Sequence, residues 1–238
     1  MGISVAQLLT LKTRVIQEVA STKSPCEVLC FGYPDVLLTR SELIAEFGED
    51  VVAGFDFKPD CAAIWLWHGR QECATEPMVD TPSLFRAFGA TDVVIVDIVA
   101  SRDVERIVDL NYPLPSDLKD RFALVIDPGT IEHCFNCGQA QKNLAESVML
   151  NGYIFTVGPL NMYNHGFYSF NPTMYVDFYG QNGFEVIDIF GTDPSTLALF
   201  QLNTTQRFNK APEGSSIGAI VKKIEKRPIT WPTQTKYL

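Results

Sequence analysis

Residues 122–136 read FALVIDPGTIEHCFN, an apolar run that ends in a carboxylate, a Pro-Gly turn and a Glu-His pair. Two other stretches nearby have the same form: residues 107–115 read IVDLNYPLP, and residues 159–173 read PLNMYNHGFYSFNPT. Carboxylates, amides, histidines and glycines that follow apolar strands gather at the carboxyl ends of a parallel sheet, where α/β proteins bind their cofactors. The sequence therefore predicts a cofactor site, and such a site argues for an enzyme.

Strand and helix patterns alternate along most of the chain. Apolar, β-branched runs predict strands over residues 27–31, 92–98, 105–109, 122–127, 153–157, 184–189 and 216–224. Helical spacing and end signals predict helices over residues 5–19, 36–47, 81–88, 138–150 and 172–182. This alternation predicts an α/β fold, a Rossmann-like three-layer sandwich with a mostly parallel central sheet and helices on both faces. We expect one domain over residues 1–238, with an insertion or lid at about residues 55–81.

Composition narrows the class of partner. The 238 residues are 46% hydrophobic and 20% charged, which is typical of a globular domain, and the formal net charge is −9. This charge argues against capture of nucleic acid or of an anionic membrane, so a small molecule is the expected partner. The sequence has neither a long apolar run nor the pattern of a secretory signal, and we expect a cytoplasmic protein.

The six cysteines are too few for a disulfide scaffold in a chain of this length, and we expect them to be reduced and mostly buried. Cys134 and Cys137 have the spacing of half a zinc site, but no second pair of ligands stands at a supporting distance. An alternative is that the carboxylates and histidines at the strand ends hold a divalent ion, but the sequence offers no close-spaced ligand set for one, and no metal site is predicted.

The residues at the strand ends carry a resemblance to a known family. Asp97 ends the second strand, Asp109-Leu110-Asn111 follow the third, and Asp127 leads into Gly129-Thr130 and Glu132-His133 after the fourth. Asn151-Gly152 and Asn182-Gly183-Phe184 stand before the next two strands. In this order the elements resemble the class I S-adenosylmethionine-dependent methyltransferases, and within them a group found among genes for surface-polysaccharide synthesis. The resemblance covers roughly residues 27–189.

The resemblance implies that the cofactor is S-adenosylmethionine and that Asp97 accepts hydrogen bonds from the ribose hydroxyls. The residues that it assigns to the cofactor are Gly32, Tyr33, Asp97, Ile98, Asp109, Leu110, Asn111, Asp127 and Gly129. One departure concerns the turn after the first strand, where the family usually has several glycines and this chain has Phe31-Gly32-Tyr33-Pro34-Asp35. The carboxylates and Asn111 also have a purely structural interpretation, because Asx residues cap helices and initiate turns.

The composition of the loop that follows the fifth strand indicates which kind of molecule accepts the methyl group. Its amides, its aromatic rings and His165 suit a polar, ring-shaped molecule such as a sugar, and we assign Asn161, Asn164 and Tyr168 to substrate binding. An imidazole can accept the hydroxyl proton as the methyl group transfers, so His165, His133 and Glu132 are the candidate catalytic residues. The alternatives are that the histidines bond to the backbone and that the loop only packs against the last helix.

The leading functional hypothesis is therefore O-methylation of a sugar, a glycan or another small molecule. We expect no nucleic-acid or membrane partner, and a homodimer is compatible with the sequence. Two alternatives stay open. A nucleotide- or NAD-linked enzyme can use a similar sheet, although the chain lacks a G-x-G-x-x-G turn. A degenerate, non-catalytic member of the fold would use the aromatic loop as a binding module.

Overall fold

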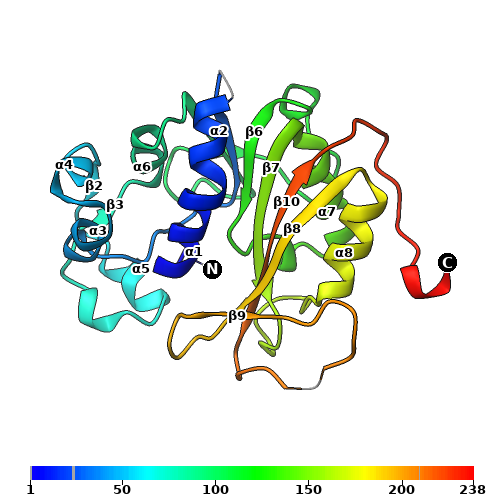
Figure 1. Cartoon of the computed structure of the whole chain (residues 1–238). Helices are drawn as coiled ribbons and strands as arrows, with labels where there is room; N and C mark the ends of the chain where they lie inside the picture. Colours follow the sequence, from blue (N-terminus) through cyan, green and yellow to red (C-terminus); the bar gives the residue numbers. More distant parts are fainter. Residues whose placement is uncertain (1, 23–24, 209) are drawn as a thin grey trace.

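A central eight-stranded sheet organises the chain in the computed structural model, which describes residues 2–22, 25–208 and 210–238 (Figure 1). The strand order is β5-β4-β1-β6-β7-β10-β8-β9. These strands are β1 (Glu27–Phe31), β4 (Asp92–Asp97), β5 (Arg106–Ile107), β6 (Phe122–Asp127), β7 (Val148–Pro159), β8 (Phe184–Thr192), β9 (Leu199–Gln201) and β10 (Ser216–Lys223).

The first five strands of this order are parallel, whereas β10 runs antiparallel to both of its neighbours, β7 and β8. Successive strands are added outward from β1 to β5, and the chain then crosses to β6 on the other side of β1. This crossing makes the carboxyl ends of β1 and β6 a topological switch point, the place where open α/β sheets bind ligands.

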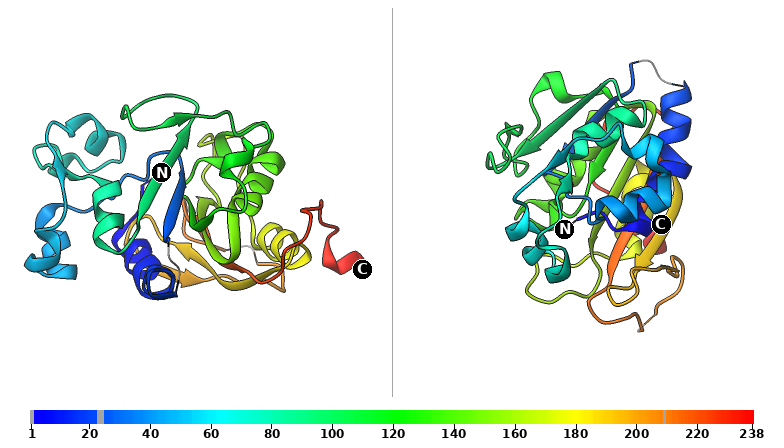
Figure 2. Two further views of the ribbon diagram at one scale, coloured as in Figure 1. Left: turned by 90° about the horizontal axis from the view of Figure 1, so that it is seen from above. Right: turned by 90° about the vertical axis from the view of Figure 1, so that its left-hand side faces the viewer.

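Helices cover both faces of the sheet (Figure 2). They are α1 (Val5–Leu11), α2 (Gln17–Thr22), α3 (Arg40–Phe47), α4 (Glu49–Val52), α5 (Ala62–Trp67), α6 (Thr81–Ala87), α7 (Cys137–Ser147) and α8 (Pro172–Gln181), and a π-helical stretch, Lys12–Ile16, joins α1 to α2. Because side chains alternate along a strand, Val28 and Cys30 of β1 pack with the core under α1, α2 and α6, and Leu29 and Phe31 pack with the core under α7 and α8. The predicted three-layer α/β sandwich is confirmed.

The segment between β1 and β4 forms an appendage beside the sheet, in cyan at the left of Figure 1. It contains α3, α4, α5 and a two-stranded antiparallel sheet of β2 (Phe57–Lys58) and β3 (Met78–Val79). Its own small core consists of Cys61, Trp65, Cys73 and Met78. Residues 55–81 lie within this appendage, and their role as a lid stays a prediction.

Several predicted boundaries were wrong, most clearly around residue 150. The helix predicted over residues 138–150 ends at Ser147, and the strand predicted from Tyr153 begins at Val148. Val148 pairs with Phe122 and Tyr153 pairs with Leu124, so β7 bulges between them, and Asn151 within the bulge has a φ of +62°. A bulge interrupts the alternation of apolar residues, and the pattern therefore hid the start of this strand.

Other differences are smaller. The helix predicted from residue 36 begins at Arg40, because Thr39 and Glu42 form a capping box there. The strand predicted over residues 105–109 shortens to β5, and β9, β2 and β3 were not predicted. In the described residues no helix has the length and apolar character needed to cross a membrane. The six cysteines are free, and five of them are buried.

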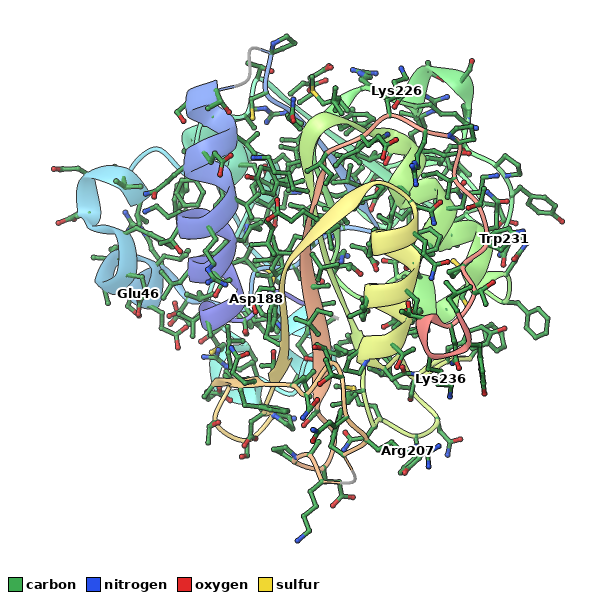
Figure 3. The ribbon with its side chains drawn as sticks, turned by 45° about the vertical axis from the view of Figure 1, so that its right-hand side comes forward. Glu46, Asp188, Arg207, Lys226, Trp231 and Lys236 are labelled. Carbon is green, nitrogen blue, oxygen red and sulfur yellow. The ribbon has the colours of Figure 1, made fainter. Side chains whose placement is uncertain are left out.

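Polar contacts fasten the layers together. The ion pair between Arg14 and Asp188 joins the N-terminal helix to β8. Asp188 is labelled in Figure 3. On the opposite face, Lys223 at the end of β10 is 3% exposed, and its Nζ donates to the carbonyl oxygens of Ala145 and Val148 at 3.2 and 2.8 Å. The same nitrogen lies 2.9 Å from Asp120 Oδ1. One buried ammonium thus joins β10 to the end of α7 and the start of β7.

We predict that Lys223→Met lowers the free energy of unfolding by about 2–3 kcal/mol, because it leaves buried carbonyls without their charged donor. Lys222→Met is the matched control. Lys222 pairs with the half-exposed Glu18 on the other face of the sheet, and its replacement is expected to lower the free energy of unfolding by less than about 1 kcal/mol. Urea unfolding measures both. Equal losses in the two variants would contradict the assignment.

Candidate active site

The turn after β1 brings the backbone close to two other strand ends. Gly32 has a φ of +74°, and its N–H donates to Val96 O of β4 at 2.7 Å. A Cβ added at Gly32 would lie 2.5 Å from Thr130 Oγ1 and 3.7 Å from Asp97 Oδ2. Only glycine fits this close approach at a positive φ, so Gly32, Asp97 and Thr130 meet at the switch point of the sheet.

A buried carboxylate fixes the turn after β6. Asp127 has no exposed surface, and its two oxygens accept hydrogen bonds from Thr130 N and Thr156 Oγ1, each at 2.8 Å. Thr130 Oγ1 in turn donates to Phe31 O at 2.6 Å. Asp127 therefore holds Thr130 against the end of β1, and the turn presents Glu132 and His133 directly afterwards.

A cavity of about 240 Å³ lies at the carboxyl ends of β4, β5 and β6. Asp97, Ile98, Asp109, Leu110 and Asn111, all assigned to the cofactor, line it together with Val108, Thr130, His133 and Cys134. Asp97 Oδ1 accepts a hydrogen bond from Val99 N at 3.3 Å. The cavity combines a carboxylate wall with apolar contacts, and His133 stands at its edge.

His133 belongs to a cluster with Glu132 and His165. The carboxylate oxygen Glu132 Oε1 lies 3.5 Å from His165 Nε2 and 3.9 Å from His133 Nε2, and the two imidazole centroids are 5.1 Å apart. Glu132 has no exposed surface, whereas the side chains of His133 and His165 are 48% and 31% exposed. Neither oxygen of Glu132 has a hydrogen-bond partner in the described residues.

Burial sets the protonation of this region. It raises the pKa of Glu132 to about 8, with a further contribution from the charge of Asp127, and it raises the pKa of Asp127 to about 6. Burial also lowers the pKa of both histidines, and His165 adds to the effect on His133. The imidazoles are therefore neutral at pH 7 and able to accept a proton or to bind a metal ion.

Some residues assigned to the cofactor also have structural partners within the protein. The Tyr33 hydroxyl donates to Asp80 Oδ1 at 3.0 Å, which turns the ring toward the appendage. Asp109 Oδ1 accepts hydrogen bonds from the backbone and side-chain nitrogens of Asn111, as in an Asx turn, and Asn111 Oδ1 accepts from Asn136 N at 2.8 Å.

Two further assignments concern the turn after β6. Both oxygens of Asp127 accept hydrogen bonds that fix the turn. Gly129 lies in the turn with a positive φ of +104°. Neither residue lines the cavity, but Asp127 holds Thr130, which does.

The loop after β7 reaches the same edge of the sheet. Phe167 N donates to Glu132 O at 2.9 Å, and a Cβ added at Gly166 would lie 2.9 Å from that oxygen, so the loop packs closely on Glu132. The Tyr168 hydroxyl donates to Phe135 O at 2.7 Å, and the exposed rings of Phe135 and Phe167 meet edge to face.

Among the residues assigned to the substrate, Asn161 bonds to Pro212 O and Ser215 N, and Asn164 stands in an exposed turn with a φ of +58°. Asn161 therefore anchors the loop to the start of β10. The rings of Tyr163 and Phe167 are exposed in this loop, as Asn164 is.

The sequence interpretation gave no role to Thr130 or Thr156. Both bond to Asp127, and a threonine in a strand or turn carries no pattern that reveals such a bond in advance. Asn136 was also missed as an N-cap of α7 that holds Asn111, although Asn before a helix is a recognisable signal.

Comparisons with known proteins give structural likenesses only. No family model and no curated protein matches the chain. Similar solved structures include a proposed methyltransferase of Bacillus halodurans C-125 (11% identity, 87% of this chain and 96% of that one, TM-score 0.46) and TehB from Haemophilus influenzae (10%, 92% and 66%, TM-score 0.45). A TehB-like SAM-dependent methyltransferase from Corynebacterium glutamicum is also similar (12%, 87% and 86%, TM-score 0.42). Scores this low fix neither a cofactor nor a substrate for this chain.

We predict that Glu132→Gln stabilises the protein at alkaline pH. Glu132 ionises near its ordinary pKa in the unfolded chain but at about 8 in the folded chain, so the folded state binds more protons between these values and wild-type stability falls as the pH rises through this window. The variant should gain a few kcal/mol over the wild type at pH 8.5 and much less at pH 5.

Urea unfolding at the two pH values, with a chelator so that no cation neutralises the carboxylate, measures this gain. Glu185→Gln, at an exposed position of β8, is the control and should follow the wild type. A Glu132→Gln curve that runs parallel to the wild type across the pH range would show that Glu132 is not a strained buried acid.

Proposed function

We propose that the protein transfers a methyl group from S-adenosylmethionine to a hydroxyl oxygen of a small polar acceptor, in the class of sugars and glycans. The observation that carries the proposal is the cavity at the switch point, which is lined by the Asp97 carboxylate and by His133, with Glu132 and His165 close to His133. A single site of this kind holds an adenosyl group and keeps a proton acceptor next to it.

The cofactor fits the cavity by the chemistry of its parts. The Asp97 carboxylate would accept hydrogen bonds from the two ribose hydroxyls, and the apolar side chains of Ile98 and Leu110, which line the same cavity, would contact the adenine ring. Gly32 would lie beside the rest of the cofactor, since its close contact with Thr130 places it at the same switch point. The net charge of −9 favours a ligand that carries a sulfonium.

Proximity and orientation supply most of the acceleration, because the sulfonium already carries a reactive methyl group. The acceptor oxygen attacks the methyl carbon, the carbon–sulfur bond breaks, and the hydroxyl proton passes to a neutral imidazole of the Glu132 cluster. S-adenosylhomocysteine leaves as a neutral thioether. The exposed rings of Phe135, Phe167 and Tyr163 offer a stacking surface for a ring-shaped acceptor.

We predict that Asp97→Asn weakens binding of S-adenosylmethionine and S-adenosylhomocysteine by about 10- to 100-fold, the cost of losing charge-assisted hydrogen bonds. Isothermal titration measures the affinities. Asp92→Asn, at the exposed start of the same strand, is the matched control and should bind as the wild type does. If folded wild-type protein binds neither ligand, the proposal fails and a non-catalytic binding module becomes the better interpretation.

We also predict that His165→Ala lowers kcat by about 10²- to 10⁴-fold, as expected for loss of general base catalysis, with little change in cofactor affinity. The assay follows radiolabelled methyl transfer to the acceptors that a screen of sugars and oligosaccharides identifies. Ser169→Ala, an exposed position in the same loop, is the control. An unchanged kcat in His165→Ala would remove this residue from the mechanism.

A further inference from the structure

Two of the three histidines of the chain converge on one buried carboxylate. Glu132 offers one oxygen, and His133 and His165 each offer one ring nitrogen, and these three ligand atoms all lie within 4.8 Å of one another. They come from two segments that are far apart in the sequence, the turn after β6 and the loop after β7. The separation in the chain means that the fold, not a local motif, creates the group.

Glu132 lacks the partners that a buried carboxylate needs. It has no exposed surface, and both of its oxygens are without a hydrogen bond in the described residues. Burying a charge without a partner is costly, and buried carboxylates are accordingly paired or bound to metal ions. Neither imidazole satisfies Glu132: the nearer nitrogen, His165 Nε2, is 3.5 Å away and makes no hydrogen bond to it.

We propose that Glu132, His133 and His165 bind a divalent transition-metal ion of the Zn²⁺ class. Two imidazole nitrogens and one carboxylate oxygen form a ligand set that such ions accept, with further coordination positions left open. Hard ions such as Mg²⁺ prefer a shell of oxygen atoms and fit the set poorly.

The spacing of the ligand atoms is close to that of a metal site. With bonds of about 2.0–2.1 Å, the ligands of a tetrahedral zinc ion lie about 3.3–3.4 Å apart. The separation of 3.5 Å between Glu132 Oε1 and His165 Nε2 nearly meets this value, and that of 3.9 Å to His133 Nε2 needs a shift of about half an ångström. The three ligand atoms lie within 4.8 Å of one another before an ion binds, so binding would also draw the two imidazoles together. His133 is half-exposed and free to make this shift.

The loop after β7 is also held in position for binding. The hydrogen bond from Phe167 N to Glu132 O fixes the backbone next to His165 against the backbone of Glu132. Gly166 allows the contact, because a Cβ there would lie 2.9 Å from Glu132 O and 3.0 Å from Glu132 Cγ. The geometry of the site thus depends on a residue that is not itself a ligand.

The open coordination positions give the ion a role, and this step rests on the proposed function. His133 lines the same cavity as Asp97, so an ion bound to His133 stands beside the proposed cofactor. The ion would polarise the acceptor hydroxyl and lower its pKa. With the ion bound, both imidazoles would serve as ligands, and water at the open edge of the cavity would take the proton in place of an imidazole.

Cobalt provides the direct test. The chelator-treated, full-length protein is titrated with Co²⁺, and the visible ligand-field absorption is followed. We expect a one-to-one complex that Zn²⁺ displaces and excess Mg²⁺ does not. Absence of the absorption band, or equal displacement by Mg²⁺, would overturn the proposal and leave Glu132 as a protonated acid.

Variants identify the ligands. Glu132→Gln, His133→Ala and His165→Ala should each abolish the absorption band or weaken Co²⁺ binding by well over 10-fold. His68→Gln removes the third histidine, which pairs with Asp35 in the appendage, and should bind as the wild type does. Undiminished binding in Glu132→Gln, or a loss confined to His68→Gln, would place the ion elsewhere. Thermal unfolding of each variant verifies that it is folded.

A further variant tests the geometry with all three ligands present. Gly166→Ala should push the loop away from Glu132 and weaken Co²⁺ binding by about 10- to 100-fold, as changes to supporting residues do in metal sites. Unchanged affinity would contradict the role of the loop contact. Titration with S-adenosylmethionine separates the two proposals: cofactor binding without a cobalt complex refutes only the metal site, and a cobalt complex without cofactor binding refutes only the proposed function.

Discussion

The carboxylate of Asp127 is the constraint on which the candidate site depends. It is buried at the carboxyl end of β6, and both of its oxygens are used, one by Thr130 N and one by Thr156 Oγ1. Through Thr130 it also reaches Phe31 O of β1, so one side chain links the ends of the three central strands β1, β6 and β7. The turn that follows therefore has little freedom, and Glu132 and His133 take their positions from it.

Two carboxylates so close together in the core oppose each other. Asp127 has hydrogen bonds that favour its ionised form, whereas Glu132 receives none from side chains in the described part of the chain. Its own burial and the charge of Asp127 both disfavour the ionised form of Glu132. A protein selected for stability alone has no reason to keep the second acid. Perturbed acids of this kind concentrate at functional sites, and the placement of Glu132 between two histidines at the edge of a cavity agrees with that tendency.

The sequence predicted the fold well and the site unevenly, for physical reasons. Strands such as β1 and β6 are continuous apolar runs buried on both faces, and their predicted bounds are those of the structure. Gly32, Asp97, Glu132, His133 and His165 stand at strand ends or in the loops that follow, where the order of elements alone brings them to one edge of the sheet.

The sequence did not predict which of these residues have spare hydrogen-bonding capacity. Asn111 and Asn161 look like ligands in the sequence, but they are engaged with Asn136 and Ser215, from segments that no pattern connects to them. The sequence also cannot predict that Glu132 has no hydrogen-bond partner among the described residues, because this depends on which donors the distant loop after β7 places beside it. Such partnerships arise only from the packed structure.

The same reasoning explains why the turn after β1 departs from a glycine-rich form. Tyr33 and Asp35 use their side chains to attach other segments: Tyr33 bonds to Asp80 at the entrance of α6, and Asp35 pairs with His68 of the appendage and with Arg102 of the loop after β4. Burial alone would raise the pKa of Asp35, but its hydrogen bonds to His68 and Arg102 outweigh the burial and lower it.

The Arg102 guanidinium also lies over the Tyr33 ring, 5.3 Å from its centroid. Additional glycines at these positions would remove the anchors of the appendage. The turn therefore keeps glycine only at residue 32, where the approach of Thr130 leaves no room for a side chain, and uses its other positions to fix the appendage and the loop after β4 beside the cavity.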